Sequence, residues 1–310
     1  MRKAALDKVA QLLAEDDRIV FVGSDLGAGT MDQVRRSFPD RVLMEGIAEQ
    51  HLIGFAAGLA MEGMIPFVHT IATFLTRRSF EQITIDVALH DLPVRLLGAG
   101  GGLVYAPLGP THEAIEDIAL MRAVPGMTVV APADSIEMEN CIQLLVNHPG
   151  PAYIRMGKGG EVKLAGTPSP SVGAARILSE GRNLAILTTG VLAQECVYAV
   201  SSLDAFPKPT VAHFPFITPL DHGTVRAILE KHSAVLIVEE HVPSGGLFTA
   251  VVEFAALNGY QSRFFHLSLP QAFPVHYGSQ QDHWQFNGLD RLGISSFIKP
   301  LVGQLFAENG

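Results

Sequence analysis

Short runs of consecutive apolar residues alternate along this chain with longer segments in which apolar residues recur every three to four positions. The first half carries five such runs, at 18–23, 66–70, 94–98, 128–131 and 152–155. Nearly continuous apolar character is typical of parallel strands that are covered on both faces. The longer segments predict helices at 49–62, 74–89, 113–123 and 134–147. Asp134 is the expected N-cap of the last helix, with Glu137 as its capping partner.

The alternation stops after Arg155 and resumes near residue 174. Residues 157–173 are dense in Gly, Pro, Ser and Lys, which is the composition of an extended linker. Four further strands are predicted at 184–188, 210–213, 234–238 and 262–265, with helices between them. Strand–helix alternation predicts parallel sheets with right-handed crossovers. We therefore expect an α/β protein with two three-layer α/β/α domains, at 1–156 and 174–310, joined by a linker at 157–173.

Composition excludes several classes of protein. Of the 310 residues, 48% are hydrophobic and 17% are charged, which is too apolar for a disordered chain. No run approaches the ~20 apolar residues of a membrane-spanning helix. The first 17 residues form an amphipathic helix pattern and lack the apolar stretch of a signal peptide. With a net charge of −9, the chain has no global attraction for nucleic acid. We expect contact with neither membrane nor nucleic acid.

The cysteines and histidines give no sign of a metal site. Cys141 and Cys196 have no CxxC spacing, so we expect buried thiols and a cytoplasmic location. The twelve histidines are scattered, and the chain contains no GxxxxGK[ST], GxGxxG, HExxH or GxSxG motif. A count of 30 glycines and a mean hydropathy of +0.26 are consistent with a large surface buried against partner chains.

The first candidate for chemistry is an acidic residue at the start of an apolar helix. Glu49 lies in the stretch GIAEQH and is followed by turns that are almost wholly apolar. One interpretation is a first-turn acid that complements the helix dipole. The other is a carboxyl group in apolar surroundings that can exchange a proton with the nitrogen of a heterocycle.

Two further stretches carry candidate chemistry. In TFLTRRSFEQ, Phe74 and Phe80 straddle Arg77. They are either core aromatics beside solvated arginines, or a platform for a flat ring with an arginine for an anion. In GPTHE, a tight turn precedes His112 at the predicted start of a helix. That geometry would offer a ring nitrogen and free backbone N–H groups to a phosphate or an oxyanion.

In this order and at these spacings, the stretches resemble the C-terminal half of the thiamine-diphosphate-dependent transketolase family. The resemblance runs through SDLGAGT, GIAEQH, TFLTRRSFEQ, GPTHEAIED, PAYIRMGKG, FITPLD, VEEHVPSGGL and HYGSQ. The first domain resembles the pyrimidine-binding domain and the second the transketolase C-terminal domain. The resemblance implies thiamine diphosphate as cofactor. It also implies transfer of a two-carbon ketol unit from a ketose to an aldehyde.

The resemblance also implies roles for individual residues. In that family the glutamate of the GIxE motif contacts N1′ of the cofactor's aminopyrimidine and stabilises its imino tautomer. Glu49 would take that role, and His112 would be the second catalytic residue. The implied substrate contacts are Arg77, His112 and Arg155. The remaining implied cofactor contacts are Asp25, Leu26, Ile47 (as a wedge between the two cofactor rings), Phe74, Arg77 and Phe80.

Two departures from the family pattern bear on the substrate. Leu108 stands where the family usually has an aspartate that hydrogen-bonds the donor's hydroxyl, and the preceding GAGGGLV lacks a histidine found in full-length transketolases. Losing a polar partner weakens recognition of a hydroxyl by a few kcal/mol at most. The expected donor is therefore a phosphoketose or a less hydroxylated, unusual sugar.

The chain contains no GDG motif, which in this family binds the metal and the diphosphate. We therefore expect the C-terminal subunit of a split transketolase. A separate N-terminal subunit would supply the ligands for Mg²⁺ or Ca²⁺ and form an α2β2 assembly with it. The alternatives are the β subunit of a 2-oxoacid dehydrogenase E1 component, a non-catalytic regulatory subunit that kept the fold, and a synthase of the deoxyxylulose phosphate type.

Overall fold

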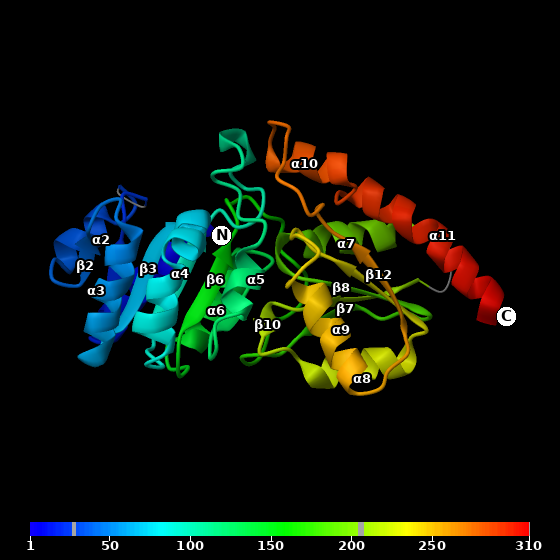
Figure 1. Ribbon diagram of the computed structural model, residues 1–310, viewed down its shortest axis with the longest axis horizontal. Helices are drawn as coiled ribbons and strands as arrows, with labels where there is room; N and C mark the ends of the chain where they lie inside the picture. The colour runs from blue at the N-terminus through cyan, green and yellow to red at the C-terminus, as the bar shows by residue number, and fades with distance from the viewer. Residues whose placement is uncertain (27–28, 204–207, 310) are drawn as a thin grey trace.

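The computed structural model describes residues 1–26, 29–203 and 208–309 and contains two β-sheets, each with helices on both faces (Figure 1). The first sheet has the strand order β10-β5-β6-β4-β3-β1-β2 and the second the order β12-β11-β8-β9-β7. Every ladder is parallel except β10 with β5 and β7 with β9. The predicted α/β architecture with mostly parallel sheets is confirmed.

The strands of the first sheet are β1 (Ile19–Gly23), β2 (Val42–Met44), β3 (Ile65–Ile71), β4 (Arg95–Ala99), β5 (Thr128–Val130), β6 (Ala152–Met156) and β10 (Phe216–Thr218). Those of the second are β7 (Arg176–Ser179), β8 (Leu184–Thr188), β9 (Thr210–His213), β11 (Ala234–Val238) and β12 (Arg263–Leu267). Strands β1, β3, β4, β5 and β6 match the five predicted runs to within one or two residues. In the second half, strands β8, β9 and β11 begin and end at the predicted residues.

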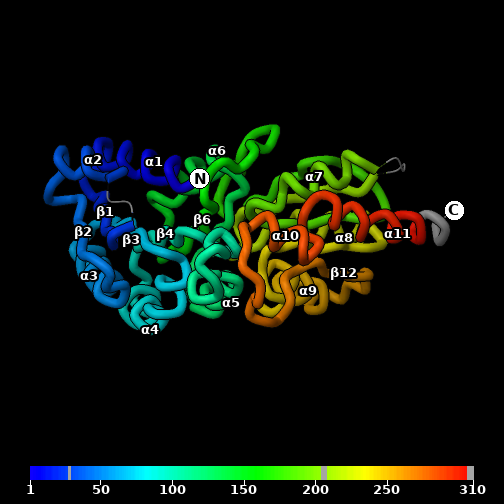
Figure 2. The backbone as a smooth tube through the Cα atoms, turned by 90° about the horizontal axis from the view of Figure 1, so that it is seen from above, coloured from blue at the N-terminus to red at the C-terminus, as the bar shows by residue number. Residues whose placement is uncertain are grey.

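Helices cover both faces of the first sheet, as the view in Figure 2 makes plain. On one face, α1 (Arg2–Glu15) and α6 (Ser135–Leu145) pack on the strands in one apolar cluster. On the other face lie α3 (Glu49–Met61), the π-helical segments Phe74–Arg78 and Ile83–Ala88 that flank α4 (Phe80–Gln82), and α5 (Asp117–Arg122). The short α2 (Asp32–Ser37) precedes β2.

The second sheet has the same three-layer arrangement. One face is covered by α7 (Ala193–Ser201), α10 (Gln280–Asn287) and the long C-terminal α11 (Arg291–Asn309), and the other by α8 (His222–Lys231) and α9 (Leu247–Leu257). Strand β10 leaves this half of the chain and pairs with β5, so the first sheet is completed from beyond residue 210. Between Met156 and Arg176 the chain forms no helix or strand.

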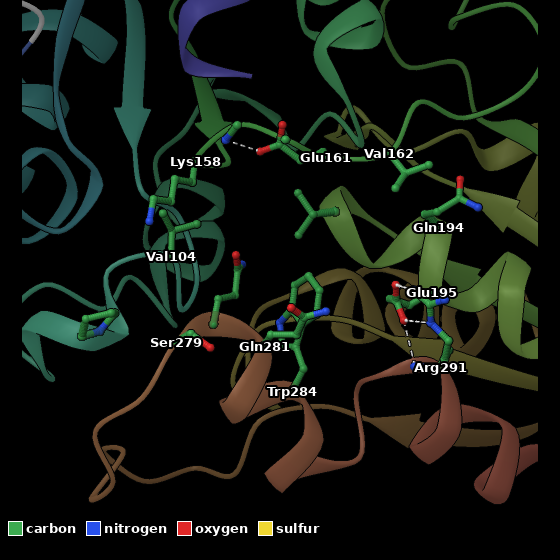
Figure 3. Close-up of a pocket in the computed structure, with 15 residues that line it drawn as sticks. Val104, Lys158, Glu161, Val162, Gln194, Glu195, Ser279, Gln281, Trp284 and Arg291 are labelled. Carbon is green, nitrogen blue, oxygen red and sulfur yellow. Dashed lines mark hydrogen bonds and ion pairs between the residues drawn. The ribbon is translucent and has the colours of Figure 1, made fainter.

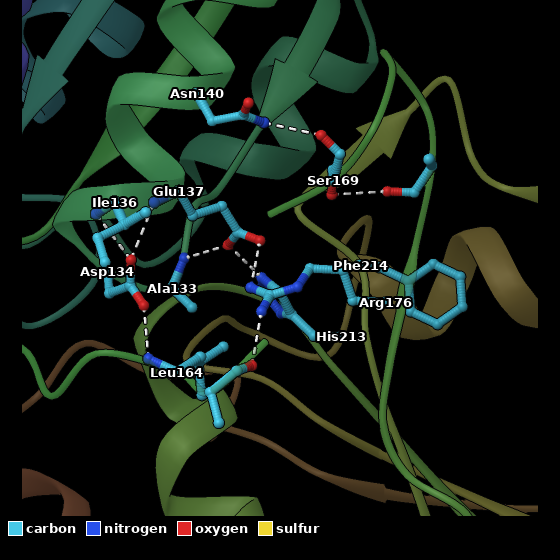
Figure 4. Close-up of polar contacts among 12 residues, drawn as sticks. Ala133, Asp134, Ile136, Glu137, Asn140, Leu164, Ser169, Arg176, His213 and Phe214 are labelled. Atoms are coloured by element: carbon cyan, nitrogen blue, oxygen red, sulfur yellow. Dashed lines mark hydrogen bonds and ion pairs between the residues drawn. The ribbon is translucent and has the colours of Figure 1, made fainter. Parts of the chain in front are cut away.

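A buried ionic network joins the two sheets (Figure 4). The Glu137 carboxylate on α6 accepts from Arg176 Nη1 of β7 at 2.9 Å and contacts His213 Nε2 of β9 at 2.7 Å. All three side chains are buried. The predicted N-cap, Asp134, accepts from the backbone N–H groups of Ile136 and Glu137, so that prediction is confirmed. Glu137, however, accepts from the N–H of Ala133 instead of that of Asp134.

Two helix predictions in the first half need correction. The helix expected at 113–123 begins only at Asp117, because Ala114 forms β-bridges with Gly101 and Gly102 and the next two residues are bends. His112 is therefore not at the start of a helix. The helix expected at 74–89 is interrupted by π turns on both sides of α4. Such turns often lie at functional sites.

The helices, the cysteines and the acidic and histidine side chains bear on the expectations about membranes, thiols and metals. Among the described residues, no helix is long and apolar enough to cross a membrane. Cys141 and Cys196 are buried free thiols, as predicted. Within the same ranges, no three His, Cys, Asp or Glu side chains are grouped so that they could hold a metal ion.

Candidate active site

The Glu49 carboxylate is buried in the first turn of α3, at the edge of the first sheet where β1 and β3 end. Only 2% of the residue is exposed. Its Oε2 accepts a hydrogen bond from Arg78 Nη1 at 2.6 Å. Its Oε1 has a single, long contact of 3.5 Å from the hydroxyl of Thr70 on β3. One carboxylate oxygen is thus tied down while the other keeps most of its hydrogen-bonding capacity.

Phe74 and His112 form an aromatic wall near this carboxylate. Their ring centroids are 5.1 Å apart with planes at 67°, which is an edge-to-face arrangement. The Arg78 guanidinium lies over the Phe74 ring, with Cζ 4.4 Å from the centroid. The hydroxyl of Thr111 contacts His112 Nδ1 at 2.8 Å and fixes the imidazole. Arg78 therefore links two predicted site residues, Glu49 and Phe74, and the Phe74 ring in turn contacts the third, His112.

Arg77, the arginine singled out in the sequence, points elsewhere. Its guanidinium forms an ion pair with Glu116, with Nη2 2.8 Å from Oε2, and donates to the backbone carbonyl of Glu113 at 2.9 Å. These contacts hold the GPTH turn against the π-helical segment. The arginine that reaches Glu49 is its neighbour, Arg78. The sequence motif singled out Arg77 and not Arg78, because the pattern carries no signal that could choose between adjacent positions.

The other predicted cofactor contacts are spread around the same edge of the sheet. Ile47 is 67% exposed and projects from the loop before α3. Asp25 is exposed and accepts from the Ser24 hydroxyl at 3.2 Å, while Leu26 packs against the cluster beneath α1 and α6. Phe80 is half-buried and packs against the cluster on the opposite face. Their roles toward a cofactor stay predictions.

Arg155, a predicted substrate contact, is enclosed in the protein. It is 7% exposed, its Nε lies 3.0 Å from Asp117 Oδ2, and it donates to the carbonyls of Ala114 and Glu240. Gly101 packs directly on this side chain, so that a Cβ there would overlap it. Arg155 thus joins β6 to α5 and to the residues that follow β11.

Glu113 is a functional candidate that its motif did not indicate, since the sequence predicts it only as the first residue of the helix at 113–123. It is 1% exposed, and neither carboxylate oxygen has a hydrogen-bond partner among the described residues. Burial raises the pKa of Glu113 to about 7, against the opposing effect of nearby Arg77. A buried acid next to His112 that changes charge near neutral pH is a candidate for proton transfer at this site.

A separate cavity lies at the junction of the two halves (Figure 3). Its volume is about 350 Å³, and Glu195 and Arg291 form an ion pair in its wall. None of the predicted site residues lines this cavity. The lining residues are Val104, Pro107, Lys158, Gly159, Gly160, Glu161, Val162, Val191, Gln194, Glu195, Ser279, Gln280, Gln281, Trp284 and Arg291.

Comparison with known proteins identifies the family. Residues 1–160 match the model of the transketolase pyrimidine-binding domain, and residues 173–290 match that of the transketolase C-terminal domain. An α/β protein with a buried acid and an aromatic wall at one sheet edge fits the first of these domains. The chain therefore belongs to the transketolase family, as the sequence motifs implied.

The curated relatives that this chain matches include 1-deoxy-D-xylulose-5-phosphate synthases. The chain is 37% identical to 1-deoxy-D-xylulose-5-phosphate synthase of Bordetella parapertussis over 303 residues, and 35% identical to that of Symbiobacterium thermophilum over 299 residues. These matches take in 96% and 95% of this chain but only 48% and 46% of the relatives. The chain thus spans about half the length of the curated relatives it matches.

Solved structures include one of about the same length. It is described as a split gene transketolase, inactive beta4 tetramer. The TM-score is 0.88 at 29% identity, and the match takes in 96% of this chain and 97% of that one. Transketolase of Campylobacter jejuni has a TM-score of 0.80 at 18% identity, over 96% of this chain and 46% of that one, which shows the shared fold.

Proposed function

We propose that this chain supplies the pyrimidine-binding half of the active site of a thiamine-diphosphate-dependent transketolase. A separate chain would supply the diphosphate-binding half. The observation that carries the proposal is Glu49. Its carboxylate is buried at the start of α3, one oxygen is held by Arg78, the other is nearly free, and the ring of Phe74 lies beside the same arginine.

The residues present fit one half of the cofactor. An aminopyrimidine needs a hydrogen-bonding carboxylate at a ring nitrogen and an aromatic face against which to stack, and Glu49 and Phe74 offer both. A diphosphate and a divalent cation need oxygen ligands grouped around the metal. Within the described ranges no such group of acidic side chains exists. We assign the ligands for Mg²⁺ or Ca²⁺ to the partner chain.

Each residue of the site has a defined task in this proposal. Thiamine diphosphate, when bound, supplies the electron sink for cleaving a bond next to a carbonyl. Glu49 Oε1 exchanges a proton with the pyrimidine nitrogen, and Phe74 and Ile47 exclude water from the rings. His112, fixed by Thr111, holds a phosphate or a developing oxyanion of the sugar. Asp25, Leu26, Arg77, Phe80 and Arg155 keep their predicted cofactor or substrate contacts within this proposal.

The donor proposed for this site is poorly hydroxylated. Leu108 is 57% exposed next to the turn that carries His112, and it presents a hydrocarbon surface where a polar side chain would bind a hydroxyl. An unmatched hydroxyl against such a surface costs up to a few kcal/mol. The transferred group remains a two-carbon ketol unit passed to an aldehyde.

The relatives named 1-deoxy-D-xylulose-5-phosphate synthase support a second candidate function. At 37% identity over 96% of the chain, a synthase reaction of that type, divided over two polypeptides, competes with ketol transfer. The split gene transketolase, whose full length this chain matches, favours the first candidate. Its description as a tetramer also supports self-association of this chain within an α2β2 assembly. A cytoplasmic location is consistent with the two free thiols.

An assay of the two-component enzyme tests the proposal. The chain is co-expressed with a polypeptide from a neighbouring reading frame that carries a GDG motif. The complex is then given a panel of ketoses with aldehyde acceptors, and in parallel pyruvate and branched 2-oxo acids. Transfer of a ketol unit supports the proposal. If decarboxylation of a 2-oxo acid is the only activity observed, the enzyme is of the E1 or synthase type. Full activity of Glu49→Gln would show that the chain is a non-catalytic subunit.

A further inference from the structure

Two adjacent arginines in the first π-helical segment have different partners. Arg77 is engaged by Glu116 and by the carbonyl of Glu113, so it belongs to the packing of the GPTH turn. Arg78 instead contacts the Glu49 carboxylate and the Phe74 ring. The π turn spans Phe74–Arg78 and brings its first and last residues to the same side of the segment.

Arg78 restricts the Glu49 carboxylate in a way that no other described contact does. A bond of 2.6 Å to a guanidinium is short and charge-assisted, whereas the 3.5 Å contact from Thr70 is at the limit of a hydrogen bond. Stacking on Phe74 at 4.4 Å in turn fixes the guanidinium. The orientation of the buried acid is thus set by a residue that also lies on the aromatic wall.

Resting on the proposed function, we infer that Arg78 is a positioning residue for Glu49. It holds Oε2 and leaves Oε1 available to a ring nitrogen of the aminopyrimidine. It also compensates the charge of a carboxylate that is otherwise buried in an apolar helix start. Because the Arg78 side chain is 46% exposed, removing it opens no cavity in the core. Its effect is therefore expected to pass through Glu49.

The chain offers a closely matched control. Arg291 is 49% exposed, pairs with Glu195 at 3.0 Å and lies 4.5 Å over the ring of Tyr198, which repeats the surroundings of Arg78 at a distance from the site. The test uses the complex with the partner chain and the variants Arg78→Ala, Arg78→Lys and Arg291→Ala. The measurements are the Kd for thiamine diphosphate, kcat, and the near-ultraviolet circular dichroism of the bound aminopyrimidine.

Arg78→Ala is expected to weaken cofactor binding about tenfold, the effect of losing a hydrogen bond to a charged group. It should also lower kcat by a larger factor and change the dichroism band. Arg78→Lys should restore part of each property, and Arg291→Ala should alter none. Unchanged kcat and dichroism in Arg78→Ala, or tighter cofactor binding, would overturn the inference. Failure of the wild-type complex to bind the cofactor would instead refute the proposed function.

Discussion

Three residues with different chemistry lie in or next to the GPTH turn. Leu108, His112 and Glu113 lie within six positions and place a hydrocarbon surface, an imidazole and a buried acid around one loop. Only His112 was identified as a candidate site residue from its motif alone. Glu113 was not, because a glutamate after a turn reads as an ordinary surface acid. Its burial arises from the pairing of Ala114 with Gly101 and Gly102, which are distant in the sequence.

Glu113→Gln is expected to make the stability of the chain less dependent on pH. The folded-state pKa of Glu113 is about 7, above its ordinary value of 4.5. As pH rises from 4.5, the unfolded chain loses this proton while the folded chain keeps it, so the wild type is progressively destabilised until about pH 7. The variant should gain relative stability over that window, by roughly 3 kcal/mol at most. Thermal melts from pH 4.5 to 8 measure it, and a pH-independent difference would contradict the assignment.

Leu108→Asp is expected to improve recognition of hydroxylated donors. The side chain is 57% exposed, so an aspartate there can be solvated without unfolding the loop. A new hydrogen bond from a donor hydroxyl to a carboxylate is worth about 1.5–3 kcal/mol. We predict a KM for phosphoketoses at least several-fold lower, with thermal stability unchanged. Steady-state kinetics on matched donors with and without the hydroxyl test this, and an equal change for both donors would count against the role of Leu108.

Helix α6 is attached to the second sheet through a single buried carboxylate. Glu137 contacts Arg176 on β7 and His213 on β9, and these partners hold the pKa of Glu137 at about 2 despite its burial (Figure 4). These contacts fix the position of α6 relative to β7 and β9. It is costly to disrupt from one side, since the remaining charges stay buried without compensation.

Glu137→Gln is therefore expected to destabilise the chain by about 3–5 kcal/mol at neutral pH. In the wild type, the stabilisation should be lost as pH falls from 4.5 toward 2, because the folded-state pKa lies below that of the unfolded chain. Glu180→Gln is the control. It breaks an exposed pair with Lys231 and should cost about 0–1 kcal/mol. Equal effects of the two substitutions in denaturant melts would show that the network does not couple the sheets.

Sequence patterns predict the elements of this fold where local and tertiary preferences agree. The apolar runs at 184–188, 210–213 and 234–238 are strands over the same residues because a strand buried on both faces needs uninterrupted apolar side chains. The helix expected from residue 113 begins only at Asp117, because the bridges from Ala114 to Gly101 and Gly102 hold the preceding residues out of a helix. Strand β10 and its antiparallel pairing with β5 have no local signal, since its partner is more than 80 residues away.

The sequence motifs predict some residues of the candidate site but not the contacts that depend on tertiary structure. Glu49, Phe74 and His112 were recognised from their motifs, and the structure brings them to one region. The choice between Arg77 and Arg78 depends on the phase of a π turn, which helical periodicity does not encode. The enclosure of Arg155 likewise depends on how Asp117 and Glu240 approach it from different elements.

At the scale of the whole molecule, this chain is two domains of a family whose single-chain members are about twice as long. The Glu49 carboxylate and the Phe74 ring lie near each other at the edge of the first sheet, joined by Arg78. In the described residues, acidic side chains are not grouped to hold a metal ion. Under the proposed function, the chain is one side of an active site, and the proposed partner chain is the other.

Calorimetric titration of thiamine diphosphate and Mg²⁺ into the isolated chain, and into its complex with the GDG-carrying partner, tests this claim most directly. Under the proposed function, the partner chain binds the diphosphate and the metal, and this chain binds the pyrimidine. We predict weak, Mg²⁺-independent binding by the isolated chain and tight, Mg²⁺-dependent binding by the complex. Tight Mg²⁺-dependent binding by the isolated chain would contradict the account.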